Sequence, residues 1–279
     1  MITSPFDSVS ARMPAEWEPH EAVWLRWPAM ATHDRAYAIK LESTWLAMTA
    51  ALADHVTVRM VVEDAAMAEH VGQQLRHFGI AEAAVEYHVI HTDDVWLRDS
   101  GPIFVKDALG RVAATGWNFN GWGGRMAYGS DRKLPAAIAA ALKMRLIETA
   151  ITTEGGAIEV NGHGTLLATR SSIVNGNRNP NWNQERIGAE LMKQLGQRHV
   201  IWLSGADPKT CESFGDDTDW HVDIAARFTS ETTVVHTATD DENDPRKPFL
   251  DRHRDELAAA RTADGKPLDL IALPAPEVA

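Results

Sequence analysis

Short β-rich runs alternate with amphipathic helical stretches along the whole chain, and this alternation restricts the fold to the α/β class. The expected helices lie at 35–55, 64–78, 135–144, 182–195 and 249–262. The expected strands lie at 56–62, 84–90, 103–105, 111–117 and 199–203, with hairpins at 157–169 and 222–237. No low-complexity or Pro/Gly-rich linker divides the pattern, so we interpret residues 1–279 as a single domain.

Four polar segments interrupt this pattern: EPHEAVWLRWP at 18–28, DDVWLRDSGP at 93–102, TEGGAIEV at 153–160 and DDTDWHVDIAARF at 216–228. They recur about every 55 to 70 residues, which is the size of one supersecondary unit. This spacing predicts functional residues at matching corners of repeated units. The intervals are too irregular for a solenoid and favour a closed, pseudo-symmetric arrangement. A fifth segment of the series would fall at or beyond residue 276.

The charge balance argues against some classes of partner. The chain has 27 Lys and Arg against 39 Asp and Glu, a formal net charge of −12. This acidity disfavours nucleic acid and anionic membrane surfaces and suits a cationic small molecule. The N-terminus shows no signal-peptide pattern, and no run of about 18 apolar residues occurs. The single cysteine, Cys211, excludes an intrachain disulfide framework, so we expect a cytoplasmic protein.

The segment at 93–102 places Asp94 and Asp99 around Trp96. One interpretation is structural, in which Arg98 pairs with a carboxylate and pins a loop. The other is functional, because carboxylates beside an aromatic wall suit a planar cation.

The segments at 153–160 and 216–228 carry an acid and a histidine. Glu154 precedes two glycines, and an ordinary turn with a solvated Glu is the simplest interpretation of that pattern. His221 and Asp223 are expected to share one face of a strand end, where a histidine beside an acid can perform acid–base work. Two alternatives stay open: a capped turn with a structural histidine, and a divalent metal site. The metal ligands would come from Asp216, Asp217, Asp219, His221 and Asp223.

Two further segments, NFNGWGG at 118–124 and NGNRNPNWN at 175–183, are rich in turn-forming Asn and Gly. We interpret both as structural. Cys211 lies in KTCESFG, which shows neither a helix start nor a cationic pocket, so we expect an incidental loop thiol.

Taken together, WEPHEAVWLRWP, DVWLRDSGP, WNFNGWGG, EGGAIEVNGHGTLLATRSSIVNGNRNP and GDDTDWHVDIAARF resemble the agmatine deiminase family, which includes the bacterial (Porphyromonas-type) peptidyl-arginine deiminases. The resemblance runs from about residue 13 to the end of the chain. It implies the pentein (α/β-propeller) fold of the guanidine-modifying superfamily, in which five ββαβ units surround a central active site. Roughly four of these five units are expected in this chain.

The resemblance also implies a reaction. A cysteine thiolate attacks the guanidinium carbon, ammonia leaves, and water releases a ureido product from the thiouronium intermediate. With agmatine the product is N-carbamoylputrescine, which leads to putrescine. Asp99 and Asp223 would hold the guanidinium nitrogens, His221 would act as acid and base, and Glu154 would support the charged form of His221. Trp96 would line the pocket, and Asp94 would contact the far end of the substrate. No metal or organic cofactor is implied.

The chain departs from the family pattern at the nucleophile. The family carries its cysteine near the C-terminus, in a GGGxIHC-type segment, and no such segment occurs here. Cys211 precedes the histidine motif and does not match that position, so we expect a C-terminally incomplete domain whose activity is doubtful. A non-catalytic guanidine-binding protein and peptidyl-arginine specificity are the alternatives. Agmatine is the expected partner, and the sequence leaves open whether the chain forms a homo-oligomer.

Overall fold

A computed structural model describes residues 10–28 and 35–276 of the chain. Within these residues the strands form four three-stranded sheets, which helices join. The predicted α/β class is therefore confirmed. The interpretation of the chain as one domain and the number of repeats in the complete fold stay predictions.

Three of the sheets are built on the same plan of strand, strand, helix, strand. They comprise β4 (Ile103–Lys106), β5 (Val112–Gly116), α5 (Leu134–Ala141) and β6 (Leu146–Glu148); β7 (Ile158–Val160), β8 (Thr165–Thr169), α7 (Gln184–Leu195) and β9 (His199–Leu203); and β10 (Ala226–Phe228), β11 (Thr233–Ala238), α9 (Lys247–Ala259) and β12 (Asp269–Pro274). In each sheet the first two strands are antiparallel, and the third runs parallel to the second across the helix. The repeated unit inferred from the sequence is thus present three times in the described residues.

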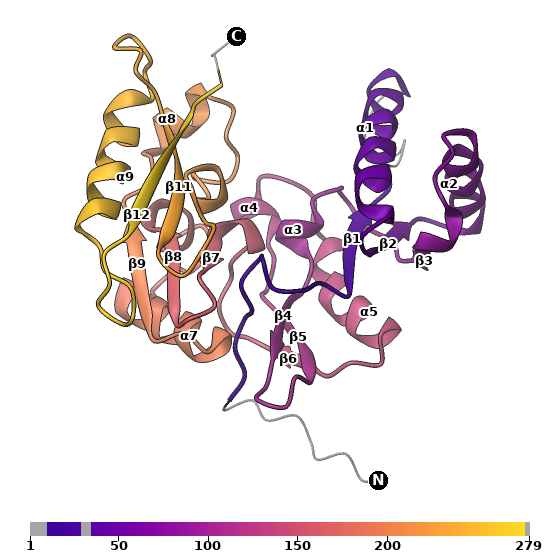
Figure 1. Ribbon diagram of the computed structural model, residues 1–279, viewed down its shortest axis with the longest axis horizontal. Helices are drawn as coiled ribbons and strands as arrows, with labels where there is room; N and C mark the ends of the chain where they lie inside the picture. Colours follow the sequence, from indigo (N-terminus) through magenta and orange to yellow (C-terminus); the bar gives the residue numbers. More distant parts are fainter. Residues whose placement is uncertain (1–9, 29–34, 277–279) are drawn as a thin grey trace.

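The N-terminal sheet differs because all three of its strands are parallel. It consists of β1 (Ala22–Arg26), α1 (Arg35–Ala53), β2 (Thr57–Val62), α2 (Ala65–His77) and β3 (Val85–Val89). Figure 1 shows this sheet with α1 and α2 at one side of the molecule and β10–β12 with α9 at the other. The remaining short elements are η1 (Glu82–Ala84), α3 (Leu97–Ser100), α4 (Gly121–Gly124), η2 (Asp131–Lys133), η3 (Gly155–Ala157), α6 (Arg170–Ile173), α8 (Pro208–Ser213) and η4 (Val222–Ile224).

Helix α7 shows how the sequence specifies these units. Its apolar residues Ile187, Leu191 and Leu195 recur every four positions and are fully buried against the strands of the central core. The side chain of Asn183 caps the start of the helix by accepting from the backbone N–H of Arg186. The helix ends at Gly196, whose φ of +62° is a left-handed conformation that favours glycine.

A one-turn helix precedes the first strand of each of the three repeated units. These are α3 before β4, η3 before β7 and η4 before β10. Helix α3 contacts η3, and η3 contacts η4. The repetition therefore brings three chain segments together that are far apart in the sequence, and the predicted functional residues lie on or beside these helices.

Most predicted elements are confirmed within a few residues, and the hairpin at 222–237 is partly wrong. Residues 222–224 form the 3₁₀ helix η4 rather than a strand, so β10 begins only at Ala226. His221 and Asp223 thus come together through a helical turn and not through the alternation of a strand. In the described part of the chain, no helix has the length and apolarity needed to span a membrane.

Candidate active site

Asp99, Glu154, His221 and Asp223 converge at the junction of α3, η3 and η4. The two ring nitrogens of His221 face two different carboxylates. Nδ1 lies 3.7 Å from Asp99 Oδ1, and Nε2 lies 3.4 Å from Glu154 Oε2. Glu154 and His221 are almost fully buried, whereas Asp99 and Asp223 are partly accessible. Glu154 is therefore not the solvated turn residue that the simplest interpretation of its motif predicted.

Gly156 lies at the meeting point of the other side chains. A Cβ atom at this position would lie 2.6 Å from Asp99 Oδ1, 2.6 Å from His221 Nδ1 and 2.7 Å from Asp223 Oδ2. Real Cβ atoms do not approach other atoms so closely, so any other residue at this position would force Asp99, His221 or Asp223 to shift. Two carboxylate oxygens and an imidazole nitrogen thus border one small volume beside the backbone, which is a suitable arrangement for a planar cation.

The two carboxylates at Gly156 differ in their protein partners. Asp99 is held in place, because its Oδ2 accepts from Trp122 Nε1 at 2.9 Å and its Oδ1 accepts from the Gly156 N–H at 2.9 Å. Among the described residues, none donates a hydrogen bond to the carboxylate of Asp223. The oxygens of Asp223 are therefore available to a ligand.

The electrostatics of the cluster favour a charged histidine. Burial alone would lower the pKa of His221, but the carboxylates of Glu154 and Asp99 outweigh it and raise that pKa above its ordinary value. Burial raises the pKa of Asp99. Burial also acts to raise the pKa of Glu154, but His221 and Arg178 reverse the effect and lower it. A bound cation would stabilise the ionised form of Asp99, whose pKa is raised.

Arg178 connects Glu154 to the chain segment before His221. Its Nε donates to Glu154 Oε1 at 3.0 Å, and its Nη1 pairs with Asp219 Oδ2. Asp219 also accepts two hydrogen bonds of 2.8 Å from Arg125. Asp219 and Trp220 both have positive φ angles, +60° and +65°, which non-glycine residues rarely adopt.

The metal interpretation of this acidic segment has no support in the geometry. Asp219 is committed to two arginines, and Asp216 accepts hydrogen bonds from Thr218 and from the backbone N–H of Trp220. Across residues 10–28 and 35–276, no group of three or more His, Cys, Asp or Glu side chains is placed to hold a metal ion.

Trp96 and Asp94 lie on the loop that leads into α3. The Trp96 side chain is 57% exposed, and the Asp94 carboxylate accepts from the N–H of Val95 at 2.7 Å. Within the described residues no side-chain hydrogen bond or ion pair joins either of them to the cluster at Gly156. Their contact with a substrate stays a prediction.

The position of Cys211 differs from the sequence interpretation. It lies in helix α8, which Asp207 caps, and not in a loop. Its side chain is buried in an apolar cluster with Trp220 and Phe249. Burial and the nearby carboxylates, chiefly Asp216, raise the pKa of the thiol to about 12. Cys211 is therefore a neutral core thiol with little nucleophilic character.

Sequence reasoning missed Arg178 and Trp122, because both lie in the Asn/Gly-rich segments that we interpreted as structural turns. Trp122 has a φ of +52°, and this turn aims its indole N–H at Asp99. The signal that could have identified them is a large aromatic or a cationic residue among Asn and Gly, as in both of these segments. In such a segment the turn can serve to direct that side chain toward a partner.

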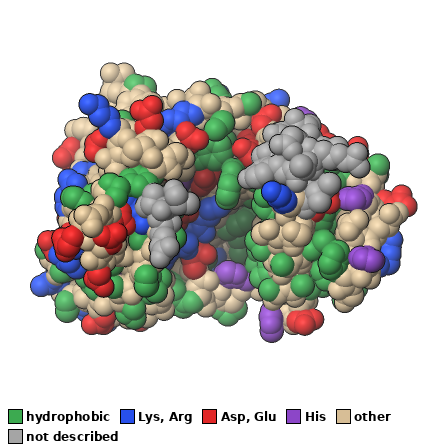
Figure 2. Space-filling model, turned by 90° about the horizontal axis from the view of Figure 1, so that it is seen from above, with side chains coloured by type: hydrophobic (Ala, Val, Ile, Leu, Met, Phe, Trp, Pro, Cys, Tyr) green, Lys and Arg blue, Asp and Glu red, His purple; other side chains and the backbone are tan. Residues whose placement is uncertain are grey.

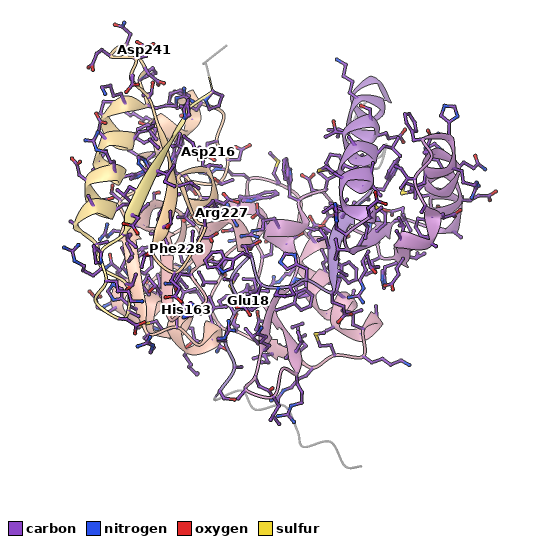
Figure 3. All side chains as sticks on the ribbon, in the orientation of Figure 1. Glu18, His163, Asp216, Arg227, Phe228 and Asp241 are labelled. Atoms are coloured by element: carbon purple, nitrogen blue, oxygen red, sulfur yellow. The ribbon has the colours of Figure 1, made fainter. Side chains whose placement is uncertain are left out.

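A second charged cluster, formed by Glu16, Arg98, Glu159 and Arg227, adjoins the first through Arg98, the sequence neighbour of Asp99. Glu159 on β7 is fully buried and pairs with Arg227 on β10, and Arg98 Nη1 contacts Glu16 Oε1 at 2.7 Å. Arg98 thus pairs with a carboxylate, as its structural interpretation expected, but it lies in helix α3, and its role in pinning a loop stays a prediction. Figure 3 places Arg227 toward the middle of the molecule and Asp241 at its periphery. Burial raises the pKa of Glu159 to about 7, despite the neighbouring arginines.

Glu159→Gln is expected to stabilise the fold at pH 8 and to change little at pH 4. The folded protein keeps the Glu159 proton up to about pH 7, whereas the unfolded chain releases it near 4.5. The free energy of unfolding therefore falls as pH rises between these values, by as much as about 3 kcal/mol. Urea unfolding at both pH values measures the effect, with the exposed Glu69→Gln as control. An equal effect of Glu159→Gln at both pH values would show that Glu159 is not protonated in the fold.

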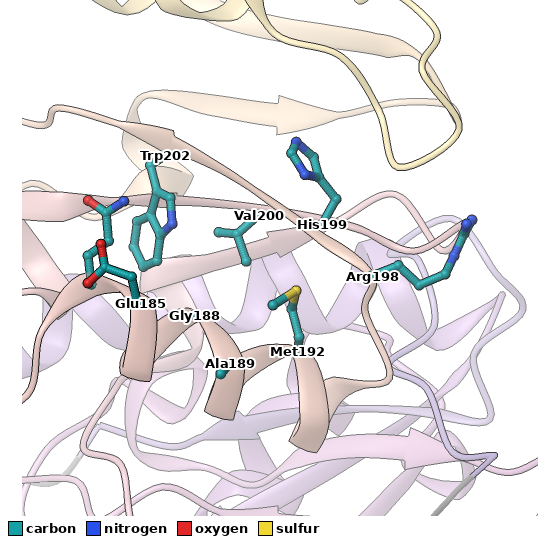
Figure 4. Close-up of a pocket in the computed structure, with 9 residues that line it drawn as sticks. Glu185, Gly188, Ala189, Met192, Arg198, His199, Val200 and Trp202 are labelled. Atoms are coloured by element: carbon teal, nitrogen blue, oxygen red, sulfur yellow. The ribbon is translucent and has the colours of Figure 1, made fainter.

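The surface of the described residues includes a groove and a larger cavity. A groove of about 290 Å³ between α7 and β9 is lined by residues such as Gly188, Met192 and Trp202, and it shares no residue with the cluster (Figure 4). A larger cavity of about 850 Å³ reaches Arg98 and Gly155, which are sequence neighbours of Asp99 and Gly156. Figure 2 shows the molecule hollowed between its two halves, with charged side chains in the hollow.

Comparison with known proteins gives a consistent result. The family model for the Porphyromonas-type peptidyl-arginine deiminases matches residues 12–279. An agmatine deiminase from Ectopseudomonas mendocina is 33% identical over 270 residues, which cover 95% of this chain and 70% of that protein. The solved agmatine deiminase of Enterococcus faecalis superimposes with a TM-score of 0.86 at 26% identity, over 99% of this chain and 74% of that one. A substrate-bound agmatine deiminase from C. Jejuni gives 0.82 at 26% identity, over 96% and 74%.

Proposed function

Because the chain belongs to the Porphyromonas-type peptidyl-arginine deiminase family, we propose that it binds a small guanidinium compound at Gly156 and carries the acid–base groups for deiminating it. The convergence of Asp99, His221 and Asp223 around the missing Cβ of Gly156 is the observation that supports this most directly. Ionisable groups from two repeated units border one point beside Gly156, which belongs to a third unit. The carboxylate of Asp223 has no donor among the described residues.

The chemistry of a guanidinium group explains the need for each residue. Resonance makes its carbon a poor electrophile, so its nitrogens must be held and its carbon aligned. Asp99 and Asp223 accept hydrogen bonds from these nitrogens. In the overall reaction water replaces one nitrogen, so a C–O bond forms, a C–N bond breaks and ammonia leaves. His221 gives its proton to the departing nitrogen and then takes one from the attacking water, while Glu154 supports its charged state.

Agmatine is the proposed substrate, with N-carbamoylputrescine as the ureido product. The relatives and solved structures named above are agmatine deiminases by name. The net charge of −12 also suits agmatine, which carries two positive charges at neutral pH.

We further propose that the nucleophile of the complete reaction is not Cys211. The one cysteine of the 279-residue chain is buried, and its thiol has a pKa of about 12. The chain by itself is therefore expected to bind agmatine but to convert it slowly. Binding without turnover is also the behaviour of a guanidine-binding protein.

Calorimetric titration with agmatine tests the proposal, with putrescine as the matched ligand that lacks the guanidinium group. Agmatine is expected to bind about 100-fold more tightly than putrescine, because only the guanidinium group reaches both carboxylates. Equal affinities for the two ligands would refute the proposal. Ureido colorimetry on the same samples measures turnover. Cys211→Ser is expected to leave both readouts unchanged, and a loss of turnover in this variant would make Cys211 the nucleophile.

A further inference from the structure

Arg178 is the most deeply buried cation of the site and has no place in the reaction described above. Its side chain is 0% exposed, and so is that of Glu154, with which it pairs. Its second carboxylate partner, Asp219, is 4% exposed. Isolated buried charges are costly, so an arginine that bridges two buried carboxylates has a strongly determined position.

The two partners of Arg178 lead to His221 by different routes. Glu154 faces the ring, with its Oε2 lying 3.4 Å from His221 Nε2. Asp219 belongs to the backbone turn that carries the histidine, two residues before it. Arg178 thus fixes the orientation of the Glu154 carboxylate, which faces the imidazole. It also holds Asp219, which anchors the turn that carries His221.

The strained turn strengthens this connection. Asp219 and Trp220 adopt positive φ angles that cost energy for residues with side chains. The hydrogen bonds of Arg178, of Arg125 and of Asn177 Nδ2, which donates to Asp219 Oδ2 at 2.9 Å, hold Asp219 in this conformation. Loss of these partners would remove side-chain contacts that oppose relaxation of the turn, which weakens the positioning of His221 between Asp99 and Glu154.

We propose that Arg178 is a positioning residue that keeps Glu154 ionised and His221 in its imidazolium form. The role assigned to His221 rests on the proposed function, but its charge state can be observed without any reaction. Arg178 acts through Glu154 and Asp219 and touches neither the imidazole nor the point beside Gly156.

The charges around His221 account for the direction of the effect. Asp99, Glu154 and Asp223 all face it and favour the cation. From the neighbouring strands β7 and β10, Glu159 and Arg227 pair with each other. Glu154 and His221 can share the proton in two ways, as an ion pair or as two neutral groups. Of these two residues Arg178 contacts only Glu154, so its charge attracts the Glu154 anion more than it repels the His221 cation. Arg178 therefore favours the ion pair.

Nitrogen-15 NMR of histidine-labelled protein at pH 7.5 tests the proposal. His221→Asn identifies the signals of His221 among those of the 12 histidines. In the unsubstituted chain both ring nitrogens of His221 are expected to resonate as protonated nitrogens. Arg178→Gln removes the cation, and Arg178→Gln combined with Asp219→Asn also removes one anion, which keeps the buried charge balanced if the single variant does not fold. Both variants are expected to lose at least half of the imidazolium signal.

The control is Arg186→Gln on the exposed surface of α7, which removes the same charge and should leave the signal of His221 unchanged. Arg178→Lys keeps the charge but not the bridging geometry, so an intermediate result is expected. A variant with native near-ultraviolet circular dichroism and an unchanged imidazolium signal would overturn the role of Arg178. If agmatine fails to bind while the signal of His221 depends on Arg178, the proposed function is wrong and this inference stands.

Discussion

Gly156→Ala is expected to lower the affinity for agmatine by about 100-fold, because it displaces carboxylates whose hydrogen bonds to the guanidinium group are worth about 1.5–3 kcal/mol each. The added methyl group would lie 2.6 Å from both Asp99 Oδ1 and His221 Nδ1, so these side chains would have to leave the positions proposed for holding the guanidinium group. Overpacking of this kind also lowers the free energy of unfolding, by about 1–3 kcal/mol. Calorimetry with agmatine and urea unfolding measure the two effects separately.

Gly129→Ala is the matched control for this substitution. Gly129 is exposed, and a Cβ there would meet nothing within 4 Å, so both affinity and stability should stay unchanged. A Gly156→Ala protein that binds agmatine as tightly as the unsubstituted chain would show that the guanidinium group lies elsewhere.

Asp223→Asn is expected to weaken agmatine binding by about 30-fold to several thousand-fold, because a lost charge partner at a partly buried ion pair costs about 2–5 kcal/mol. Asp223 suits this test better than Asp99, whose carboxylate also accepts from Trp122 and Gly156 and therefore supports the fold. Titration calorimetry across a range of salt concentrations measures the loss.

Asp217→Asn removes the same charge from an exposed position in the segment before His221. It should change the affinity less than twofold at physiological salt, where exposed charges are screened. If the two variants lose affinity equally, Asp223 acts through the net charge of the protein and not through direct contact with the guanidinium group.

The sequence predicted the scaffold of this site well. Asp99, Glu154 and His221 were expected at matching corners of repeated units. Each lies just before the first strand of its unit, ahead of β4, β7 and β10 respectively. The prediction was possible because the repeat is encoded locally, by hydrophobic periodicity and by turn residues that act over a few positions.

The details of the site could not be predicted because distant partners set them. His221 was expected on a strand, but the turn before it takes positive φ angles that depend on contacts from Arg125 and Arg178. Arg178 reaches Glu154 across 24 positions and Asp219 across 41. Local propensity carries no information about such pairs. Cys211 was assigned to a loop for a related reason, since its six-residue helix is too short to show periodicity.

A crystal structure of the chain grown with agmatine tests the central claim most directly. The account predicts a guanidinium group against Gly156, with its nitrogens within hydrogen-bond distance of Asp99 and Asp223 and its carbon beside His221 Nδ1. Agmatine bound at another place, with the volume beside Gly156 filled only by water, would contradict it.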